Sequence, residues 1–284
     1  MTSAALQEIA TGLTAGTVIP YLGPEVLTLE PETCPVPATP SDLVKLLTSK
    51  VSVPHKIRNN LTAAAQFIEN FKHRKSVVSL MNEAYAPGVQ PNVLHRYLAG
   101  LSKKPLLIVD TWYDDAMAKA LSERGNWGQI QGVSQAEHFG QWVHYFDHQG
   151  NPVEAKEADT WHIILYKPLG SIVPAKNFIV SDSDYVEVLT EIDIQTPIPP
   201  RVQELRTGSH FLFLGCRFNN QLTRTYARQV MKRSSDKHWA VIEGTLSRME
   251  LKFLEEQNIT RIDLPLAQFV EWLQSGKIEE ELAA

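Results

Sequence analysis

Residues 106–115 read LLIVDTWYDD. Four apolar residues follow Pro105 and lead into an aspartate, a threonine, two aromatic residues and two more aspartates. A short apolar run of this kind is typical of a fully buried parallel strand. Residues 114–121 (DDAMAKAL) then predict a helix that begins with acids, as helices favour. Open α/β sheets bind ligands at such strand ends, but this stretch alone favours a plain junction whose aspartates cap the helix.

Strand and helix patterns alternate on both sides of this stretch. Further strands are predicted at 17–22, 177–180, 210–214, 237–242 and 259–264, and helices at 3–13, 181–191, 221–233, 247–256 and 266–273. This alternation predicts an α/β fold with a Rossmann-like, doubly wound, mostly parallel sheet. Pro20 removes one amide donor from the first strand, which favours an edge position for that strand or an early turn. Ser181 and Asp184 resemble a capping box at a helix start.

Two segments read as insertions into a single domain of residues 1–284. Helical patterns at 41–48, 61–72, 75–83 and 92–101, with no strand between them, predict an inserted helical module over approximately 40–102. Residues 126–140 have no clear period and are predicted to be a mobile loop. Segments 141–147 and 160–167 are predicted to pair antiparallel, so approximately 126–168 is expected to be a loop plus β-hairpin insertion.

The composition is that of a soluble globular protein and argues against several other classes. The chain has 284 residues, of which 43% are hydrophobic and 21% charged, as in ordinary soluble globular proteins. A net charge of −5 argues against a general affinity for nucleic acid or anionic membranes. Two distant cysteines without a CxxC motif provide neither a disulfide framework nor a four-cysteine zinc site. The sequence has no signal-peptide pattern or membrane-length apolar run, so we expect a cytoplasmic protein.

Four junctions follow predicted strands in a fixed order: YLGP at 21–24, DTWYD at 110–114, KPLGS at 167–171 and LGC at 214–216. Their order and spacing resemble the Sir2-like (sirtuin-related) family, in particular its bacterial NAD-consuming branch, over roughly residues 16–273. That family typically reads F-x-G-A-G, T-N-Y-D, L-H-G-S and F-x-G-x-S/L at these places. SDSDYVEVL at 181–189 also resembles an acidic-aromatic helix start of that branch. The resemblance implies a fold that binds NAD across the switch point of the sheet.

Two departures from the family pattern concern its chemistry. The family uses an asparagine and a histidine to orient water and the nicotinamide ribose while the glycosidic bond breaks. Those positions fall on Trp112 and Leu169 here. Indole is only a donor and leucine has no polar group, so neither can accept a proton. Because general-base help is typically worth about 10²–10⁴-fold, the resemblance implies a pseudoenzyme with little NAD-cleaving activity.

The glycine-rich loop departs as well, since Gly-Ala-Gly becomes Gly23-Pro24-Glu25. Proline removes an amide donor, and glutamate places a carboxylate where a pyrophosphate would approach. Other matches to the family favour retained binding of NAD or ADP-ribose. The predicted binding residues are Gly23, Thr111, Trp112, Asp114, Gly170, Ser171, Gly215, Cys216 and Gly244. No metal is expected, because the zinc module of deacetylating sirtuins needs paired CxxC motifs.

Several residues have two interpretations. Glu25, Asp110, Asp114 and Asp115 could form a rebuilt acid/base site for glycosidic cleavage, but helix capping and fold-stabilising hydrogen bonds are favoured. Among His138, His144, His148 and His162, the pair His144 and His162 would suit a metal only if their strands face each other. A polar strand surface is favoured there.

Cys216 could be a reactive thiol, although a buried core or ribose-contacting residue is favoured. Trp112 could fill the cleft, which would give a closed scaffold, or stack on a flat ligand ring. The sequence leaves that alternative open.

Three functions follow. The first is a catalytically degenerate protein that binds a nucleotide of the NAD or ADP-ribose type or regulates a protein partner. The second is an active NAD hydrolase or ADP-ribosyl-transferring enzyme whose acid/base role has moved to Glu25 or Asp114. The third is a structural subunit of a larger assembly, with the helical insertion as the interface to a protein partner.

Overall fold

Strand β2 (Leu106–Asp110) lies inside a large sheet in the computed structural model of the chain, and all five of its residues are buried. The structure describes residues 3–101, 105–191 and 198–275. Within those residues nine strands form one sheet in the order β11-β10-β9-β1-β2-β6-β3-β4-β5. The other eight strands are β1 (Val18–Leu22), β3 (Trp127–Gly132), β4 (Val143–Asp147), β5 (Pro152–Val153), β6 (Ile163–Lys167), β9 (His210–Leu214), β10 (His238–Val241) and β11 (Ile259–Ile262).

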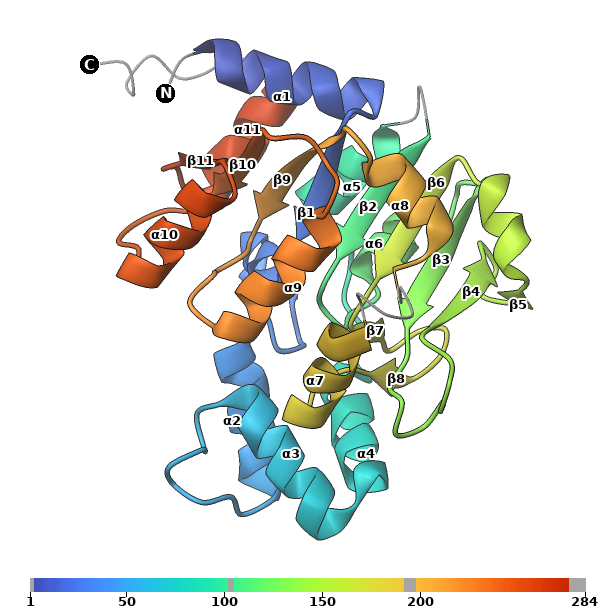
Figure 1. Cartoon of the computed structure of the whole chain (residues 1–284), viewed down its shortest axis with the longest axis vertical. Helices are drawn as coiled ribbons and strands as arrows, with labels where there is room; N and C mark the ends of the chain where they lie inside the picture. The colour runs from blue at the N-terminus through green and yellow to red at the C-terminus, as the bar shows by residue number, and fades with distance from the viewer. Residues whose placement is uncertain (1–2, 102–104, 192–197, 276–284) are drawn as a thin grey trace.

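The pairing of the strands confirms the predicted α/β class. All neighbours from β11 to β3 run parallel, and β4 and β5 add an antiparallel edge. Helices cover both faces of the sheet (Figure 1). One face packs against α1 (Ser3–Ala15), α5 (Val93–Gly100), α6 (Ala116–Leu121) and α11 (Leu266–Ser275). The other packs against α8 (Pro200–Arg206), α9 (Gln221–Met231) and α10 (Arg248–Glu256). The fold is therefore Rossmann-like and doubly wound.

Three further helices lie beyond the carboxyl ends of the strands, at the bottom of Figure 1. They are α2 (Pro40–Lys50), α3 (Leu61–Lys72) and α4 (Arg74–Tyr85). These three pack on one another, whereas α5, the fourth predicted helix of this region, packs on α6. Asn60 caps α3 by accepting a hydrogen bond from the Ala63 amide at 3.2 Å. The sheet edge thus faces a helical unit, which we call the α2–α4 unit.

Arg74 connects the α2–α4 unit to the sheet domain. Its guanidinium lies 2.8 Å from the carboxylate of Asp184 and 3.0 Å from that of Glu137, and it also donates to the carbonyl of Phe178. Asp184 in turn accepts the amide of Ser181 at 3.0 Å, which confirms the predicted capping box at the start of α7 (Asp182–Glu191). One buried carboxylate therefore serves both the helix cap and the contact between the two parts.

The predicted edge position of the first strand is wrong. β1 is a central strand, with β9 and β2 as its parallel neighbours. Pro20 is tolerated there because pairing with β2 begins only at Tyr21, one residue after the proline. The missing amide therefore leaves no gap in the hydrogen-bonded ladder.

Two predictions for residues 126–168 are also wrong: the loop at 126–140, and the antiparallel pairing of 141–147 with 160–167. β3 occupies residues 127–132, is buried throughout and pairs parallel with β6. β4 pairs antiparallel with β3, and β6 lies between β2 and β3, so the segments 141–147 and 160–167 do not pair. A separate small hairpin joins β7 (Gly170–Ser171) to β8 (Asn177–Phe178).

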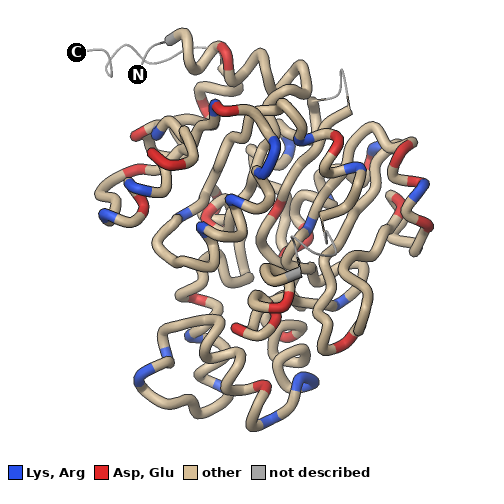
Figure 2. The backbone as a smooth tube through the Cα atoms, viewed as in Figure 1, with Lys and Arg blue, Asp and Glu red and all other residues tan. Residues whose placement is uncertain are grey.

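Acidic and basic residues are interspersed along the chain (Figure 2). None of the described helices has the length and apolar character that a membrane crossing requires.

Candidate functional site

A cavity of about 590 Å³ opens where β1, β2 and β9 end. The α2–α4 unit closes its far side through the starts of α2 and α3. This is the edge at which open α/β sheets bind ligands. The lining residues used below are Tyr21, Gly23, Pro24, Glu25, Asn60, Thr111, Trp112, Tyr113, Leu169, Tyr185, Cys216, Arg217, Phe218 and Tyr226.

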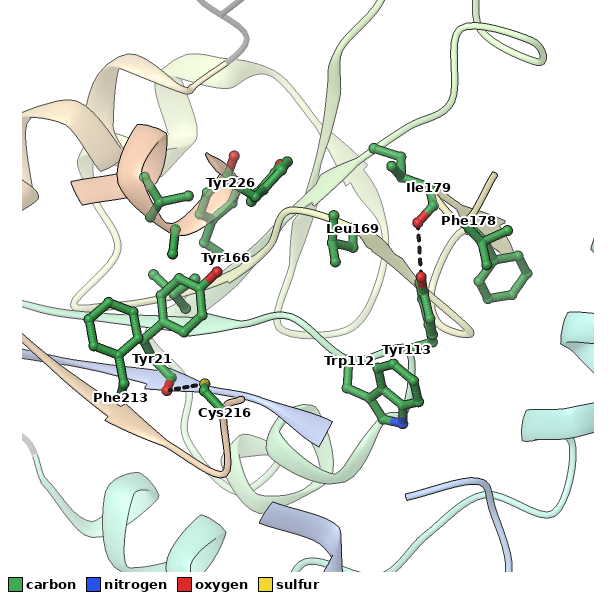
Figure 3. Close-up of a cluster of buried hydrophobic side chains, with 14 of the residues drawn as sticks. Tyr21, Trp112, Tyr113, Tyr166, Leu169, Phe178, Ile179, Phe213, Cys216 and Tyr226 are labelled. Atoms are coloured by element: carbon green, nitrogen blue, oxygen red, sulfur yellow. Dashed lines mark hydrogen bonds between the residues drawn. The ribbon is translucent and has the colours of Figure 1, made fainter. Parts of the chain in front are cut away.

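Trp112 follows β2 and is held in one orientation. Its main-chain amide donates to the carboxylate of Asp110 at 3.1 Å, and its indole nitrogen donates to the carbonyl of Pro37 at 2.7 Å. The ring of Tyr85 meets it edge-on, with centroids 6.4 Å apart. In Figure 3 the indole lies across a shared space from Leu169 and Cys216. Trp112 therefore forms a wall of the cavity without filling it.

A buried ion pair lies beneath this wall. The ammonium group of Lys167, at the end of β6, is 2.8 Å from the carboxylate of Asp110 and donates to the carbonyl of Asp114 at 3.0 Å. Burial raises the pKa of Asp110 to about 6, while Lys167 and the Trp112 amide oppose that rise. The pair joins the ends of two neighbouring strands and fixes the backbone that carries Trp112.

The predicted carboxylate cluster does not form at the cavity. Asp110 is paired with Lys167, and Asp114 is buried and accepts the amide of Ala116 at the start of α6. Asp115 forms an ion pair with Lys119 at 3.0 Å. Of the four acids considered, Glu25 is the one that lines the cavity. The three aspartates thus make fold-stabilising contacts: Asp114 accepts an amide of the helix, and Asp110 and Asp115 form ion pairs.

The loop after β1 directs its amides into the protein. The Gly23 amide donates to the carbonyl of Leu214 at 2.8 Å, and the Glu25 amide to that of Gly215 at 3.1 Å. The Val26 amide donates back to Gly23 at 3.3 Å, and Pro24 has no amide hydrogen. Within the described residues, this loop therefore presents no unpaired amide to a phosphate, unlike a phosphate-binding glycine loop.

Two glycines at this loop serve contacts within the protein. A Cβ atom on Gly23 would lie 2.3 Å from the carbonyl oxygen of Gly215. Gly215 has a φ of +63°, and its Cβ would lie 2.4 Å from the Val26 amide nitrogen. The loops after β1 and β9 therefore approach as closely as they do because both residues lack a side chain.

The remaining predicted binding residues divide between the cavity and its support. Thr111 lines the cavity, and its hydroxyl donates to the Leu22 carbonyl at 2.8 Å. Gly170 and Ser171 form β7, where the Ser171 hydroxyl donates to the carbonyls of Tyr113 and Asp114 at 3.4 and 3.3 Å. Gly244 follows β10, and its amide donates to the Asp263 carboxylate. These last three residues lie outside the cavity lining.

Leu169 and Cys216 line the cavity with apolar or weakly polar surface. The thiol of Cys216 is 3.6 Å from the carbonyl of Tyr21, as Figure 3 shows. Burial, and secondarily the charge of Glu25, raises the pKa of Cys216 well above its usual value. The thiolate form is therefore suppressed, which disfavours the reactive-thiol interpretation.

The predicted histidine pair is not brought together by facing strands, since β4 and β6 are not neighbours. His144 instead lies beside His138, with ring centroids 4.7 Å apart. Within the described residues, no group of three or more histidine, cysteine or acidic side chains is placed to hold a metal ion.

Several lining residues escaped the sequence analysis. Phe218 and Arg217 follow β9, Tyr185 comes from α7, and Tyr226 comes from α9. Arg217 is held by buried Glu250, with Nε–Oε1 at 3.0 Å and Nη2–Oε2 at 3.2 Å. Two signals were available: Arg217 and Phe218 directly continue the LGC junction, and Tyr185 is the aromatic residue of the SDSDYVEVL stretch. Tyr226 carries no comparable signal.

A family model described as the SIR2-like domain matches residues 106–262, which is more than half of the chain and runs from β2 to β11. A search of curated proteins found no match. Together with the doubly wound sheet and the cavity at its carboxyl edge, the family match shows that this chain belongs to the SIR2-like domain family, an NAD-related family.

Proposed function

We propose that this protein binds a ligand of the NAD or ADP-ribose type in the cavity and does not cleave its glycosidic bond efficiently. The observation that carries the proposal is that Trp112 and Leu169 both line an open cavity of about 590 Å³. The motif resemblance assigns these two residues to the positions of the family's asparagine and histidine. The cavity is large enough for a nucleotide, but these two side chains cannot move a proton.

The other titratable groups of the lining give limited help to cleavage. The hydroxyls of Tyr21, Tyr113 and Tyr226 and the thiol of Cys216 have pKa values raised by burial, so they remain protonated near neutral pH. Arg217 is engaged by Glu250 and stays cationic. A group that takes a proton near neutral pH would therefore have to be Glu25, among the lining residues that the structure describes.

Glu25 also supports a second candidate, an NAD hydrolase with a relocated base. Its carboxylate lines the cavity, and burial raises its pKa towards the range that suits general acid–base catalysis. Asp114, the other predicted base, is a buried helix-capping group outside the lining. The two candidates differ in one measurable quantity, the rate of nicotinamide release.

The test is to incubate the full chain with NAD and quantify nicotinamide, in parallel with thermal unfolding in NAD and in ADP-ribose. Binding without cleavage predicts a rise of a few degrees in melting temperature, since a ligand at 100 times its Kd adds about 2.7 kcal/mol, and no release above buffer. Release that disappears in Glu25→Gln would establish the hydrolase instead. If NAD and ADP-ribose cause no shift in melting temperature and no nicotinamide is released, the third function is favoured. The protein would then be a structural subunit of an assembly, with its protein partner at the α2–α4 unit.

A further inference from the structure

Glu25, Arg217 and Glu250 set the charge at the rim of the cavity, where the loops after β1 and β9 meet. Glu25 makes no hydrogen bond or ion pair through its side chain within the described part of the chain. Arg217, the cationic residue of the lining, is occupied on two nitrogens by Glu250, which is 1% exposed. Glu250 is itself fixed by the capping box of Ser247, whose amide donates to it at 2.9 Å. Arg217 also acts on Glu25, since it opposes the rise that burial causes in the pKa of Glu25. One guanidinium therefore faces two carboxylates, and the rim keeps a net negative charge.

The same rim is unsuited to a phosphate group. The main-chain N–H groups of Gly23, Glu25 and Val26 all donate hydrogen bonds to carbonyls of the protein. Pro24 has no N–H group. An anion at this loop would meet no free donor there and would lie beside the Glu25 carboxylate. Like charges at short range are repulsive, particularly where the site is partly removed from water.

The walls around this carboxylate are aromatic. The aromatic lining residues are Tyr21, Trp112, Tyr113, Tyr185, Phe218 and Tyr226. Trp112 is fixed by its hydrogen bond to Pro37, so its orientation does not depend on a ligand. Aromatic faces attract cations through their quadrupole, and a carboxylate in the same site adds a direct counter-charge. Flat organic cations combine both requirements, because they stack on rings and carry positive charge.

We infer that the cavity recognises its ligand through a flat organic cation of the N-substituted pyridinium class, with Glu25 as the counter-ion and the aromatic walls as the stacking surface. This inference rests on the proposed function and names the half of an NAD-type ligand that the site reads. The pyrophosphate half contributes little at the β1 loop. A ligand that has the pyrophosphate but no cationic ring therefore binds more weakly than a ligand that has the cationic ring but no pyrophosphate.

Three probes test this by isothermal titration calorimetry on the full chain at low salt. 1-Methylnicotinamide carries the cationic ring, nicotinamide is the neutral ring, and ADP-ribose carries the pyrophosphate without the cation. The cation is expected to bind at least about tenfold more tightly than nicotinamide, since a desolvated cation–π contact alone supplies that factor. Glu25→Gln is expected to reduce this ratio towards one. Glu32→Gln, which removes the same charge at an exposed residue of the next turn, is expected to preserve it.

The outcomes separate the inference from the function on which it rests. Equal binding of the cation and nicotinamide, or a cation preference that survives Glu25→Gln in a folded variant, overturns the inference. If ADP-ribose binds in that case, the proposed function stands. If none of the three probes binds, both are overturned. If the cation binds as expected but NAD is cleaved rapidly, the inference stands and the proposed absence of cleavage fails.

Discussion

The indole nitrogen of Trp112 lies 2.7 Å from the carbonyl oxygen of Pro37, a residue of the loop that leads into α2. Trp112 is therefore a structural link between the sheet edge and the segment that closes the cavity. The indole at this position therefore contributes to the stability of the fold as well as to the wall of the cavity.

Trp112→Phe should lower the free energy of unfolding by about 1–3 kcal/mol, because the buried Pro37 carbonyl loses its donor. Urea unfolding followed by circular dichroism measures this change. Trp127→Phe is a matched control, since the buried indole nitrogen of Trp127 has no partner within the described residues. It removes the same atoms without breaking a hydrogen bond. A loss in Trp127→Phe as large as that in Trp112→Phe would contradict the argument.

Lys167→Met should destabilise the protein by about 3–5 kcal/mol, the usual cost of leaving one partner of a buried ion pair uncompensated. The stranded group is Asp110, which is 4% exposed. The deficit relative to wild type should shrink as the pH falls from 7 towards 5. Without Lys167 the pKa of Asp110 rises beyond its value of about 6, so protonation then removes the buried charge.

Denaturant titrations of both proteins at pH 7 and pH 5 test this prediction. The double variant Lys167→Met/Asp110→Asn should recover part of the loss at pH 7, because it has no buried charge. A single variant whose stability stays within about 1 kcal/mol of wild type at pH 7 would show that the ion pair does not hold this strand end.

The elements with regular apolar patterns were predictable from the sequence, and the polar buried ones were not. The LLIVD run and the Ser181–Asp184 cap have local signals, and both are present in the structure. β3 reads WGQIQG and is fully buried, but its two glutamines interrupt the apolar pattern by which a buried strand is recognised. Gln129 donates to the carbonyl of Val173 at 2.8 Å, and Gln131 reaches carbonyls of the β7–β8 hairpin. Only a three-dimensional partner makes such side chains compatible with burial.

The candidate site shows the same division. Strand ends were identifiable, so Gly23, Thr111 and Cys216 could be assigned to the sheet edge, and they line the cavity. Asp114 lies on the same segment and yet caps a helix, because consecutive residues after a strand point in different directions. Asn60, which lines the cavity from α3, depends on how the α2–α4 unit docks, and no local pattern encodes a long-range placement.

His95 should make the protein less stable in acid. It is buried in α5, and its Nδ1 accepts the Asn92 amide at 3.2 Å, an arrangement that requires a neutral ring. Burial lowers its pKa from 6.5 to about 4. The folded pKa lies below the unfolded one, so the stabilisation is complete above pH 6.5 and is lost as the pH falls towards 4. The loss is up to about 3 kcal/mol.

His95→Gln tests this prediction, because glutamine keeps the capping-box acceptor and does not titrate. Between pH 6.5 and 4 the free energy of unfolding of the variant should fall by less than that of wild type. A residual slope is expected from His238, whose pKa burial also lowers to about 4. Identical pH dependence in the two proteins would mean that His95 is not held neutral.

Cys216 should be protected from thiol reagents in the folded protein. Its Sγ lies 3.5 and 3.6 Å from the carbonyls of Leu214 and Tyr21, and burial raises its pKa well above the usual value. Cys34 is half-buried, and its pKa is also raised by burial. Because Cys216 is buried and Cys34 is only half-buried, Cys216 should react with maleimide more slowly than Cys34 at pH 7.5, by a factor on the order of ten or more.

The single-thiol variants Cys34→Ala and Cys216→Ala allow each rate to be measured alone by mass spectrometry. In urea both thiols should react at similar rates, because unfolding removes the difference in burial. A ligand that fills the cavity should slow Cys216 further and leave Cys34 unchanged, since Cys216 lines the cavity and Cys34 does not. Rapid labelling of Cys216 in the folded Cys34→Ala variant would instead indicate a solvent-open thiol at the sheet edge, and would reopen the interpretation of this cysteine as a reactive group.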